Sequence, residues 1–572
     1  MQRLLFTAGL FALSQVVYTQ VTCSETFSPI TAEDFVANLH PGWNLGNTLD
    51  AIPDEGSWNN APVEGATLDM IKESGFNSVR LPVTWTHHFI SESPDWTVDP
   101  EWLQRVSDVV DLIIARDFYV IVDVHHDSWE WADVTVAGAD LALIEEKFYR
   151  LWYQIGTTLG CKSSLVAFES INEPPANTAE DGAQINRLNS IFLQAIADAG
   201  GFNPERVVNL VGGGQDSIKT SQWFEAPANI TNPWALQFHY YSPYDFIFSA
   251  WGKTIWGSDE DKDLLSTDFE LIRNNFTDVP LILGEYDASP TNTEPAARWK
   301  YFDHLQRVAS KLGISTIIWD NGADHLDRTI GEWRDPTSLQ LVVGTTADTA
   351  NSLPDSTEDA TATEQWSSAY IFHQAGEEAT EQTLPYLFKG NSLVSITDSA
   401  GTVLASGSDY SVSGDVIVFS STYLASKYTA STAPSVIDTL TLTFDGGVAS
   451  PTLDIVVWDT PVLASTSVSA SSVSGADLLI PITWAGIAKP AAVKALTESG
   501  VYLFDDWTQW LGPLQQARAT YSNHWNWDAE NVIITSAAID VVVAAGETTI
   551  FTFEFYPRVN GTANTVEFTL TV

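Results

Sequence analysis

Two glutamates in this sequence have the surroundings of a catalytic pair. Glu173 lies in FESINEPP (168–175), and Glu285 lies in LILGEY (281–286). Two carboxyl groups that converge on one cleft can cleave a glycosidic bond, because one protonates the leaving oxygen while the other attacks the anomeric carbon or activates water. Either glutamate alone is most simply a solvated loop residue, so the prediction depends on the elements that bring the two together.

Eight short apolar runs between residues 40 and 320 predict those elements. The runs are GWNL (42–45), SVRLP (78–82), YVIVDVH (119–125), VAFESIN (166–172), VVNLVGG (207–213), ALQFHY (235–240), LILGE (281–285) and STIIW (315–319). Segments with helical spacing, such as 101–117 and 298–313, separate them. Strands that are apolar on both faces and alternate with helices predict an α/β fold, a parallel (β/α)8 TIM barrel.

Polar residues stand at the carboxyl ends of these runs, which form the active-site face of such a barrel. They are Arg80, His125, Asn172 with Glu173, His239, Glu285 and Trp319. Glu173 ends the fourth strand and Glu285 ends the seventh, so the two are predicted to face each other across the barrel mouth. Glu169, earlier in the fourth strand, is predicted to be structural, with no role in the chemistry.

The composition changes after the barrel. SSAYIFHQAG (367–376) is predicted to be its closing helix, preceded by a long surface loop at 337–365. Beyond it, Ser, Thr, Val and Gly increase and apolar residues alternate with period two, which predicts all-β sandwiches. The predicted domains are a signal peptide at 1–20, a catalytic barrel at 21–377, and two sandwich modules at 378–460 and 461–572.

The net charge limits the partners. With 73 acidic and 26 basic residues the chain carries a formal charge of −47, which argues against nucleic acid and anionic membranes and favours a neutral substrate. No later stretch is long enough to span a bilayer, and the first twenty residues have a basic start at Arg3 and a short apolar run, as secretory signal peptides do. A secreted, extracellular protein is expected.

Cysteines and sequons bear on the same expectation. Cys23 and Cys161 are the two cysteines, and either a single disulfide or two unpaired thiols is compatible with the sequence. Asn-x-Ser/Thr triplets mark Asn229, Asn275 and Asn560 as N-glycosylation candidates.

Seven motifs carry a family resemblance. They are GWNLGNTLDA (42–51), GFNSVRLPVTW (75–85), VIVDVHHD (120–127), INEP (171–174), FHYYSPYDF (238–246), LGEY (283–286) and IIWDNG (317–322). Together, over roughly residues 35–375, they resemble glycoside hydrolase family 5, and look closest to its subfamily 4 of endo-β-1,4-glucanases and xyloglucanases.

The resemblance implies a role for each strand-end residue. Glu173 matches the general acid/base and Glu285 the nucleophile of a retaining double displacement. Substrate contacts or catalytic support are implied for Asn44, Arg80, His125, His126, Asn172, His239, Tyr241, Trp251 and Trp319. Arg80 is expected to keep Glu285 ionised, and an apolar setting is expected to raise the pKa of Glu173. Trp256 is the alternative to Trp251 as a stacking residue in the leaving-group sites.

No cofactor and no catalytic metal are expected. His125 and His126 are neighbours, and neighbours in a strand point to opposite faces, so the pair is not predicted to share an ion. GGGQDS (212–217) lacks the lysine and spacing of a phosphate loop and is predicted to be a plain tight turn.

The two sandwich modules carry weaker resemblances. PSVIDTLTLTFDGG (434–447) resembles the immunoglobulin-like X2 module, and the last module resembles carbohydrate-binding module family 46, which folds back against the cleft. Its candidate sugar platforms are Trp507, Trp510, Trp525 and Trp527. The alternative is that two of these tryptophans fill the sandwich core.

The predicted function is that of a secreted endo-β-1,4-glucanase, active as a monomer on cellulose, mixed-linkage β-glucan or xyloglucan. An endo-β-mannanase and a non-catalytic glycan-binding wall protein are the alternatives. The sequence does not rank the glucans, because the choice depends on the space that the cleft leaves for side branches.

Overall fold

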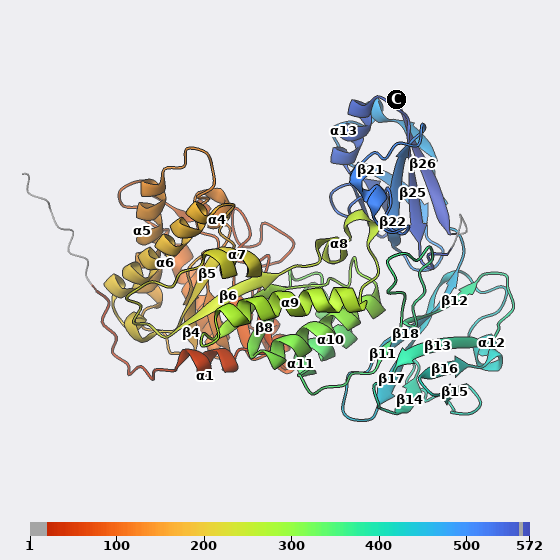
Figure 1. Cartoon of the computed structure of the whole chain (residues 1–572), viewed down its shortest axis with the longest axis horizontal. Coiled ribbons are helices and arrows are strands. Elements are labelled where there is room, and N and C mark those ends of the chain that lie inside the picture. Colours follow the sequence, from red (N-terminus) through yellow and green to blue (C-terminus); the bar gives the residue numbers. More distant parts are fainter. Residues whose placement is uncertain (1–19, 560–563) are drawn as a thin grey trace, which may run out of the picture.

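The eight apolar runs form parallel strands that close into one barrel, with β1 to β8 in chain order (Figure 1). The computed structural model describes residues 20–559 and 564–572. The predicted signal peptide, apart from Gln20, and the sequon residue Asn560 lie outside the described residues. The predicted barrel is confirmed.

The barrel strands and the helices around them follow the expected alternation. The strands are β1 (Gly42–Asn44), β2 (Ser78–Leu81), β3 (Tyr119–Val122), β4 (Val166–Glu169), β5 (Val208–Asp216), β6 (Trp234–Tyr240), β7 (Leu281–Tyr286) and β8 (Ile314–Ile318). The helices are α1 (Ala32–Ala37), α2 (Gly65–Glu73), α3 (Pro100–Ile114), α4 (Asp127–Glu130), α5 (Leu141–Leu159), α6 (Ala179–Ala199), α7 (Ser217–Trp223), α8 (Tyr244–Ile247), α9 (Asp259–Asn275), α10 (Pro295–Lys311) and α11 (Pro336–Gly344). Short 3-10 turns are η1 (Thr86–His88), η2 (Asn203–Glu205) and η3 (Ala250–Gly252).

Local sequence explains these elements. All six residues of β7 are buried, as expected of a strand enclosed by side chains within the barrel and helices outside it. Helix α3 starts where the Asp99 side chain caps the amide of Glu101, and a proline occupies its first turn. Its buried residues Val106, Val109, Val110 and Ile113 recur at helical spacing and face the barrel wall.

The second module is a sandwich of two four-stranded sheets, ordered β11-β13-β16-β15 and β12-β18-β17-β14. Its elements are β11 (Leu353–Pro354), β12 (Tyr370–Gln374), β13 (Gln382–Leu387), β14 (Leu393–Thr397), β15 (Tyr410–Ser413), β16 (Val416–Phe419), α12 (Ser421–Lys427), β17 (Ser435–Phe444) and β18 (Thr452–Trp458). Strand β17 alternates buried and half-buried residues, as period-two patterning predicts.

Two predictions about the end of the barrel are wrong. Residues 367–376 are not a closing helix, because Tyr370–Gln374 form strand β12, which runs parallel to β18. Aromatic and β-branched residues in this stretch favour a strand once a partner edge is present. The closing helix is α11, which lies in the segment expected to be a loop and is capped by Asp335. The sandwich therefore takes up chain from before residue 378.

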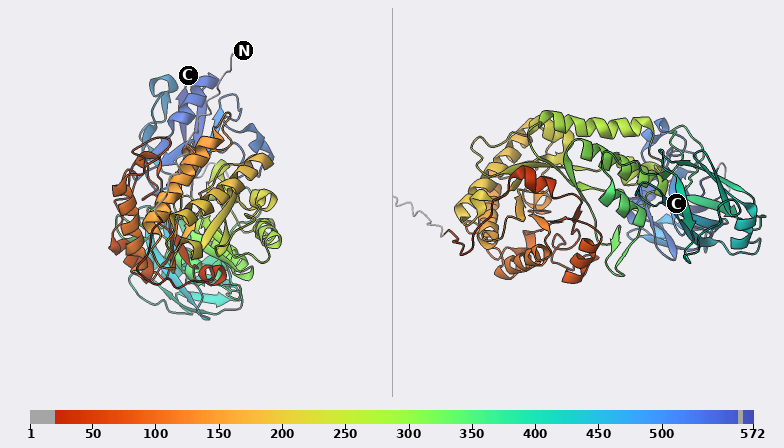
Figure 2. Two further views of the ribbon diagram at one scale, coloured as in Figure 1. Left: turned by 90° about the vertical axis from the view of Figure 1, so that its left-hand side faces the viewer. Right: turned by 90° about the horizontal axis from the view of Figure 1, so that it is seen from below.

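The third module is a second sandwich, with sheets β19-β21-β24-β23 and β20-β26-β25-β22. Its elements are β19 (Val462–Leu463), β20 (Ser467–Ser469), η4 (Ala470–Ser472), β21 (Leu478–Thr483), β22 (Pro490–Thr497), η5 (Asp506–Trp510), β23 (Trp525–Trp527), β24 (Asn531–Ile534), α13 (Ser536–Ala545), β25 (Thr549–Phe555) and β26 (Thr565–Thr571). Both sandwiches lie on the same side of the barrel, away from α5 and α6 (Figures 1 and 2).

The segment that contains Cys23 is tied to the barrel by a disulfide between Cys23 and Cys161, whose Cα atoms are 5.4 Å apart. This resolves the alternative that the sequence left open. None of the helices within the described residues is both long and apolar enough to cross a membrane.

Candidate active site

Glu173 and Glu285 meet at the carboxyl end of the barrel. Glu285 is in β7, and Glu173 follows β4 with a positive φ of 38°. Glu285 is 5% exposed, whereas the side chain of Glu173 keeps 24% of its surface open to the cleft. One carboxylate oxygen from each glutamate and a ring nitrogen of His239 lie within 4.8 Å of one another. The predicted pairing of the two strand ends is therefore present in the fold.

Arg80, at the end of β2, holds the nucleophile side of this pair. Its Nη1 donates to Glu285 at 2.6 Å and to Asn44 Oδ1 at 3.1 Å, and its Nη2 donates to Asn172 Oδ1 at 2.8 Å. The guanidinium is fully buried, so each of these bonds has no water competing for it.

Two further carboxylates complete the shell around Arg80. Glu169 accepts from Nε at 2.7 Å and from Nη2 at 2.8 Å, and Asp123 accepts from Nη2 at 2.8 Å. Glu169, predicted to be structural, is the buried, forked partner of Arg80. Its side chain points into the barrel, and the apolar surroundings make an ion pair necessary for a charge at that depth.

The two glutamates differ in the causes that act on their pKa values. Burial raises the pKa of Glu173 from 4.5 to about 7, against the attraction of Arg80. This agrees with the expected protonated acid. Burial also raises the pKa of Glu285, and His239, Arg80 and the hydroxyl of Tyr241 oppose that rise. Arg80 favours the ionised form of Glu285, as expected, but burial is the larger cause and raises the pKa.

His239 and Tyr241, from the end of β6, each contact one glutamate. The His239 Nδ1 lies 2.7 Å from a Glu173 oxygen, and the Tyr241 hydroxyl donates to Glu285 at 2.8 Å. Burial lowers the pKa of His239 to about 4, so the ring is neutral near pH 6. A neutral imidazole leaves the proton on Glu173 rather than drawing it away.

The floor and one wall of the cleft come from β3 and β8. The rings of His125 and Trp319 are parallel, with centroids 5.9 Å apart, and His126 lies 4.6 Å from His125. Both histidines line the cleft. The argument that they point to opposite faces is wrong, because β3 ends at Val122 and strand alternation stops there.

These histidines form a cluster with Asp50, with one polar atom from each residue within 4.8 Å. The two oxygens of Asp50 accept the backbone amides of Thr48 at 2.6 Å and Asn47 at 3.0 Å, so the carboxylate already serves to shape the loop after β1. This donor set fits a turn better than a metal.

The cleft is about 740 Å³ and is shared between two modules. Barrel residues form most of it, and Thr520 to Asn523 of the third module close one side. Hydrogen bonds to the barrel hold that module in place. Trp251 Nε1 donates to Asp505 at 2.8 Å, Arg558 donates to Thr254 Oγ1 at 2.7 Å, and Lys489 lies 3.3 Å from the carbonyl of Thr291.

The four tryptophans predicted in the third module divide into two pairs. Trp507 is 41% exposed and Trp510 is 82% exposed, and Trp507 packs edge-on against Trp251 with ring centroids 4.6 Å apart. Trp525 is 2% exposed and lies in the module core, so its prediction as a sugar platform is wrong. Trp527 is half-buried and stacks against Trp525.

An aromatic strip links the catalytic centre to Trp507. Tyr241 neighbours Phe248, Phe248 neighbours Tyr244, and Tyr244 neighbours Trp251, with ring centroids 4.9 to 5.9 Å apart. Tyr244 and Phe248 are exposed. Trp256, the alternative to Trp251, is fully buried and packs in the barrel core.

Asn44, expected to contact substrate or to support catalysis, is fully buried and supports the site. It accepts from Arg80 and donates to the backbone carbonyls of Gly284 and Ile318. Two other residues of the site, Asp123 and Gln215, were not assigned a role from sequence. Asp123 receives His125 Nδ1 at 2.7 Å. Gln215 lies in the GGGQDS segment, which continues strand β5 as an irregular end instead of forming a plain turn. Only the position of Asp123, two residues before His125, was a usable signal.

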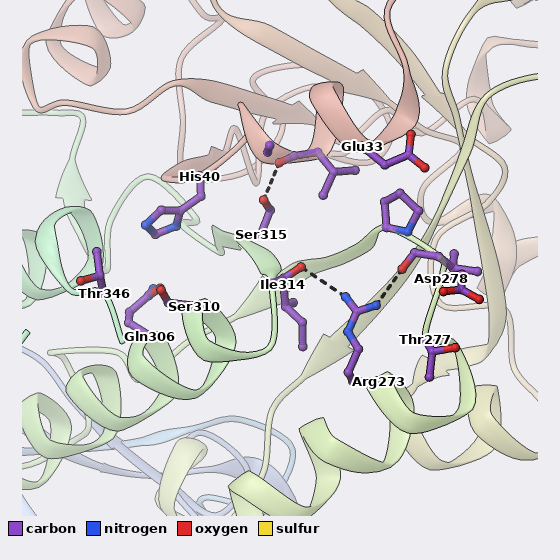
Figure 3. A pocket seen from close by; sticks show the side chains of 15 residues that line it. Glu33, His40, Arg273, Thr277, Asp278, Gln306, Ser310, Ile314, Ser315 and Thr346 are labelled. Carbon is purple, nitrogen blue, oxygen red and sulfur yellow. Dashed lines mark hydrogen bonds between the residues drawn. The ribbon is translucent and has the colours of Figure 1, made fainter. Parts of the chain in front are cut away.

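A second cavity of about 440 Å³ lies at the opposite, amino end of the barrel (Figure 3). Its arginine, Arg273, donates to the carbonyls of Val279, Leu312 and Gly313, and Ser315 donates to the carbonyl of Val36. These polar groups serve the fold.

The sequons place two asparagines on the surface. Asn229 lies in the loop before β6 and Asn275 at the end of α9, and both are exposed. Their glycosylation stays a prediction.

The chain is similar to known proteins along most of its length. A family model described as cellulase (glycosyl hydrolase family 5) matches residues 43–325, and one described as carbohydrate binding domain X2 matches residues 365–455. Endoglucanase B of Paenibacillus lautus is 28% identical over 462 residues, which span 78% of either chain. Endoglucanase B of Clostridium cellulovorans is 32% identical over 308 residues, 51% of this chain and 69% of the relative.

The three-module arrangement also has a solved counterpart. A tri-modular GH5 (subfamily 4) endo-beta-1,4-glucanase from Bacillus licheniformis, in complex with cellotetraose, is 32% identical with a TM-score of 0.83. The similarity covers 95% of this chain and 100% of that structure.

Proposed function

This chain belongs to glycoside hydrolase family 5, and we propose that it is a secreted endo-β-1,4-glucanase that acts with retention of configuration. The observation that carries the proposal is the Glu173–Glu285 pair, whose oxygens lie within 4.8 Å of each other beside His239. Carboxyl groups about 5 Å apart are typical of retaining enzymes, whereas inverting enzymes need about 6.5 to 9.5 Å to admit a water.

In the proposed first step, a Glu285 oxygen attacks the anomeric carbon. The bond from that carbon to the leaving oxygen breaks, and Glu173 gives its proton to that oxygen. In the second step, ionised Glu173 takes a proton from water, the water oxygen attacks the same carbon, and Glu285 is released. The pKa of about 7 suits both roles of Glu173, because the group is protonated below neutral pH and accepts a proton again after the first step.

The supporting residues fit this sequence of steps. Arg80 and Tyr241 each bond Glu285, and so align the attacking oxygen and favour its ionised form. The side-chain oxygen of Asn172 accepts a hydrogen bond from Arg80, so its amide nitrogen is the group that can donate to a sugar hydroxyl. His239 lies next to Glu173 and, being neutral, allows the acid to keep its proton.

The substrate proposed is a β-1,4-linked glucan. A neutral polymer is compatible with the charge of −47, and the cellotetraose bound by the similar Bacillus licheniformis enzyme points to the same class. The Trp319 ring beside the glutamates supplies a flat surface for one sugar. The strip from Phe248 through Trp251 to Trp507 supplies further surface on the side of the leaving group, where we place the contribution of the third module.

Secretion, N-glycosylation and a monomeric state are part of the proposal. Secretion and N-glycosylation are supported by the signal-like first twenty residues, the Cys23–Cys161 disulfide and two exposed sequons. Preference among cellulose, mixed-linkage glucan and xyloglucan depends on the width of the cleft beside Thr520 to Asn523.

The proposal is tested by reducing-sugar release from carboxymethylcellulose, barley β-glucan, xyloglucan and mannan, measured side by side. We expect activity on at least one glucan, loss in Glu285→Gln, and no release from mannan. Activity on mannan alone would favour the β-mannanase alternative. Near wild-type glucan hydrolysis by Glu285→Gln would refute the assignment of the nucleophile.

A further inference from the structure

We propose that Gln215 is a positioning residue that aligns the acid Glu173 by connecting its backbone to the ion-pair network of Glu285. The inference rests on the proposed function, because it assigns a role in proton donation. Gln215 lies on the irregular end of β5, next to β4 in the barrel (Figure 1), and its side chain is fully buried.

Glu173 needs such a support because its backbone is in the left-handed region. Its φ is 38°, a conformation that side chains other than glycine rarely adopt and that persists only when the surroundings fix it. The conformation turns the chain sharply after Asn172 and aims the carboxyl group into the cleft, where it reaches His239 at 2.7 Å. A relaxed backbone at this residue would move the proton away from the leaving oxygen.

Gln215 supplies the bond that fixes this conformation. Its Oε1 accepts the backbone amide of Glu173 at 2.6 Å, and its Nε2 donates to Glu169 Oε1 at 3.0 Å. The two partners also set the orientation of the amide, because a backbone N–H requires an acceptor and a carboxylate requires a donor. A reversed amide would place two donors together and two acceptors together.

A continuous path then joins the two catalytic groups. Glu169 takes a forked bond from Arg80, and Arg80 donates to Glu285 at 2.6 Å. Buried groups thus link the two catalytic residues: the backbone of Glu173, the amide of Gln215, the carboxylate of Glu169, the guanidinium of Arg80 and the carboxylate of Glu285. These bonds hold the two catalytic groups at a fixed separation, which the reaction requires.

The surrounding backbone supports the same contact. Gly214 donates its amide to the carbonyl of Pro174 at 2.7 Å, so the end of β5 runs beside the segment that carries Glu173. A Cβ at Gly213 would come within 2.6 Å of the Ala176 side chain. Glycine there lets the two segments approach, and Gln215 itself takes a positive φ of 48° to face Glu173.

The alternative is that Gln215 only satisfies buried polar groups and stabilises the fold. The two interpretations differ in which substrates suffer when it is replaced. A misplaced acid slows cleavage of a sugar leaving group, which needs a proton, but hardly slows cleavage of a dinitrophenyl group, which leaves without one. General loss of structure slows both equally.

The first measurement is kcat/KM for cellotetraose and for dinitrophenyl β-cellobioside in the full-length chain. We expect Gln215→Met to lose about 100-fold on cellotetraose and less than about 5-fold on the aryl glycoside. Gln154→Met is the matched control, because Gln154 also accepts a backbone amide, from Val98 at 2.9 Å, and donates to a backbone carbonyl, but outside the cleft. We expect it to keep wild-type kinetics on both substrates.

The second measurement uses Gln215→Glu. A protonated carboxyl group at this position can accept from Glu173 and donate to Glu169, as the amide does, whereas the ionised form faces the charge of Glu169. Other charged or titratable groups around this contact are Arg80 on β2, which bonds the same Glu169 oxygen, and the carboxyl of Glu173 with its partner His239 on β6. The activity of Gln215→Glu relative to wild type should therefore rise as pH falls, while the same ratio for Gln215→Met stays flat.

Equal losses on the two substrates in Gln215→Met, or a flat activity ratio across pH in Gln215→Glu, would overturn the proposal. If Gln215→Met does not fold, the pH profile of Gln215→Glu decides alone. A wild-type protein that hydrolyses neither substrate would instead refute the proposed function, and the role of Gln215 with it.

Discussion

Replacing the acid, Glu173→Gln, should make the protein inactive on glucan and at the same time more stable above neutral pH. Folded Glu173 keeps its proton up to about pH 7, whereas an unfolded glutamate loses it near 4.5. Between these values the folded state binds more protons than the unfolded state, so the folded protein loses stability as pH rises. The loss is complete above about pH 7 and absent well below 4.5.

The magnitude follows from the shift. Since one pKa unit corresponds to about 1.4 kcal/mol, a rise from 4.5 to about 7 destabilises the folded protein by roughly 3 kcal/mol at pH 8. Glutamine has the same shape and no charge to desolvate, so Glu173→Gln should recover most of that free energy. For a barrel of this size the melting temperature would rise by roughly 3 to 6 °C.

Thermal unfolding followed by tryptophan fluorescence, at about pH 8 and about pH 4, measures this effect. The melting temperature of Glu173→Gln should exceed that of the wild type at the higher pH and equal it at the lower one. Glu169→Gln is the contrasting variant, four residues earlier in the chain: it removes a buried partner of Arg80 and should destabilise by about 3 kcal/mol or more. A lowered melting temperature for Glu173→Gln at pH 8, or an equal rise at both pH values, would refute the reasoning.

Three other predictions concern the cleft. Arg80→Lys keeps the charge but loses the forked bond to Glu169 and the single bond to Glu285, and should lower kcat/KM on barley β-glucan by about 100-fold. An effect below about 3-fold would show that alignment by the guanidinium is unimportant. Because the acid must be protonated, kcat/KM should fall about tenfold per pH unit above pH 7, and constant activity up to pH 9 would contradict the pKa of Glu173. Trp507→Ala should raise KM for xyloglucan by about tenfold and leave dinitrophenyl β-cellobioside unaffected. Trp366→Ala is the control, because Trp366 is also exposed. Equal KM changes in the two variants would show that the third module does not contribute to the substrate site.

The sequence predicts the barrel and the catalytic pair well, for a physical reason. Strands buried on both faces are nearly all apolar, so a charged residue at the end of such a run, as at Arg80 or Glu285, is visible against its neighbours. The fold then brings strand ends together, whatever their separation along the chain.

Other parts of the site depend on contacts that no local pattern encodes. The role of Gln215 requires the irregular register between β5 and β6, and GGGQDS by itself has the composition of a turn. Trp525 and Trp527 share a strand face, but which face meets solvent depends on how the sandwich packs. Strand β12 forms only because β18, more than eighty residues later, offers it an edge.

The most direct test of the account is covalent trapping of the nucleophile. A fluorinated β-cellobioside with a dinitrophenyl leaving group should inactivate the wild-type enzyme, because the first step proceeds and the second is slowed, and peptide mapping should find the sugar on Glu285. Labelling of Glu173 or of any other residue would contradict the assignment of the two glutamates, and hydrolysis of glucan without any trapped sugar would contradict the double displacement.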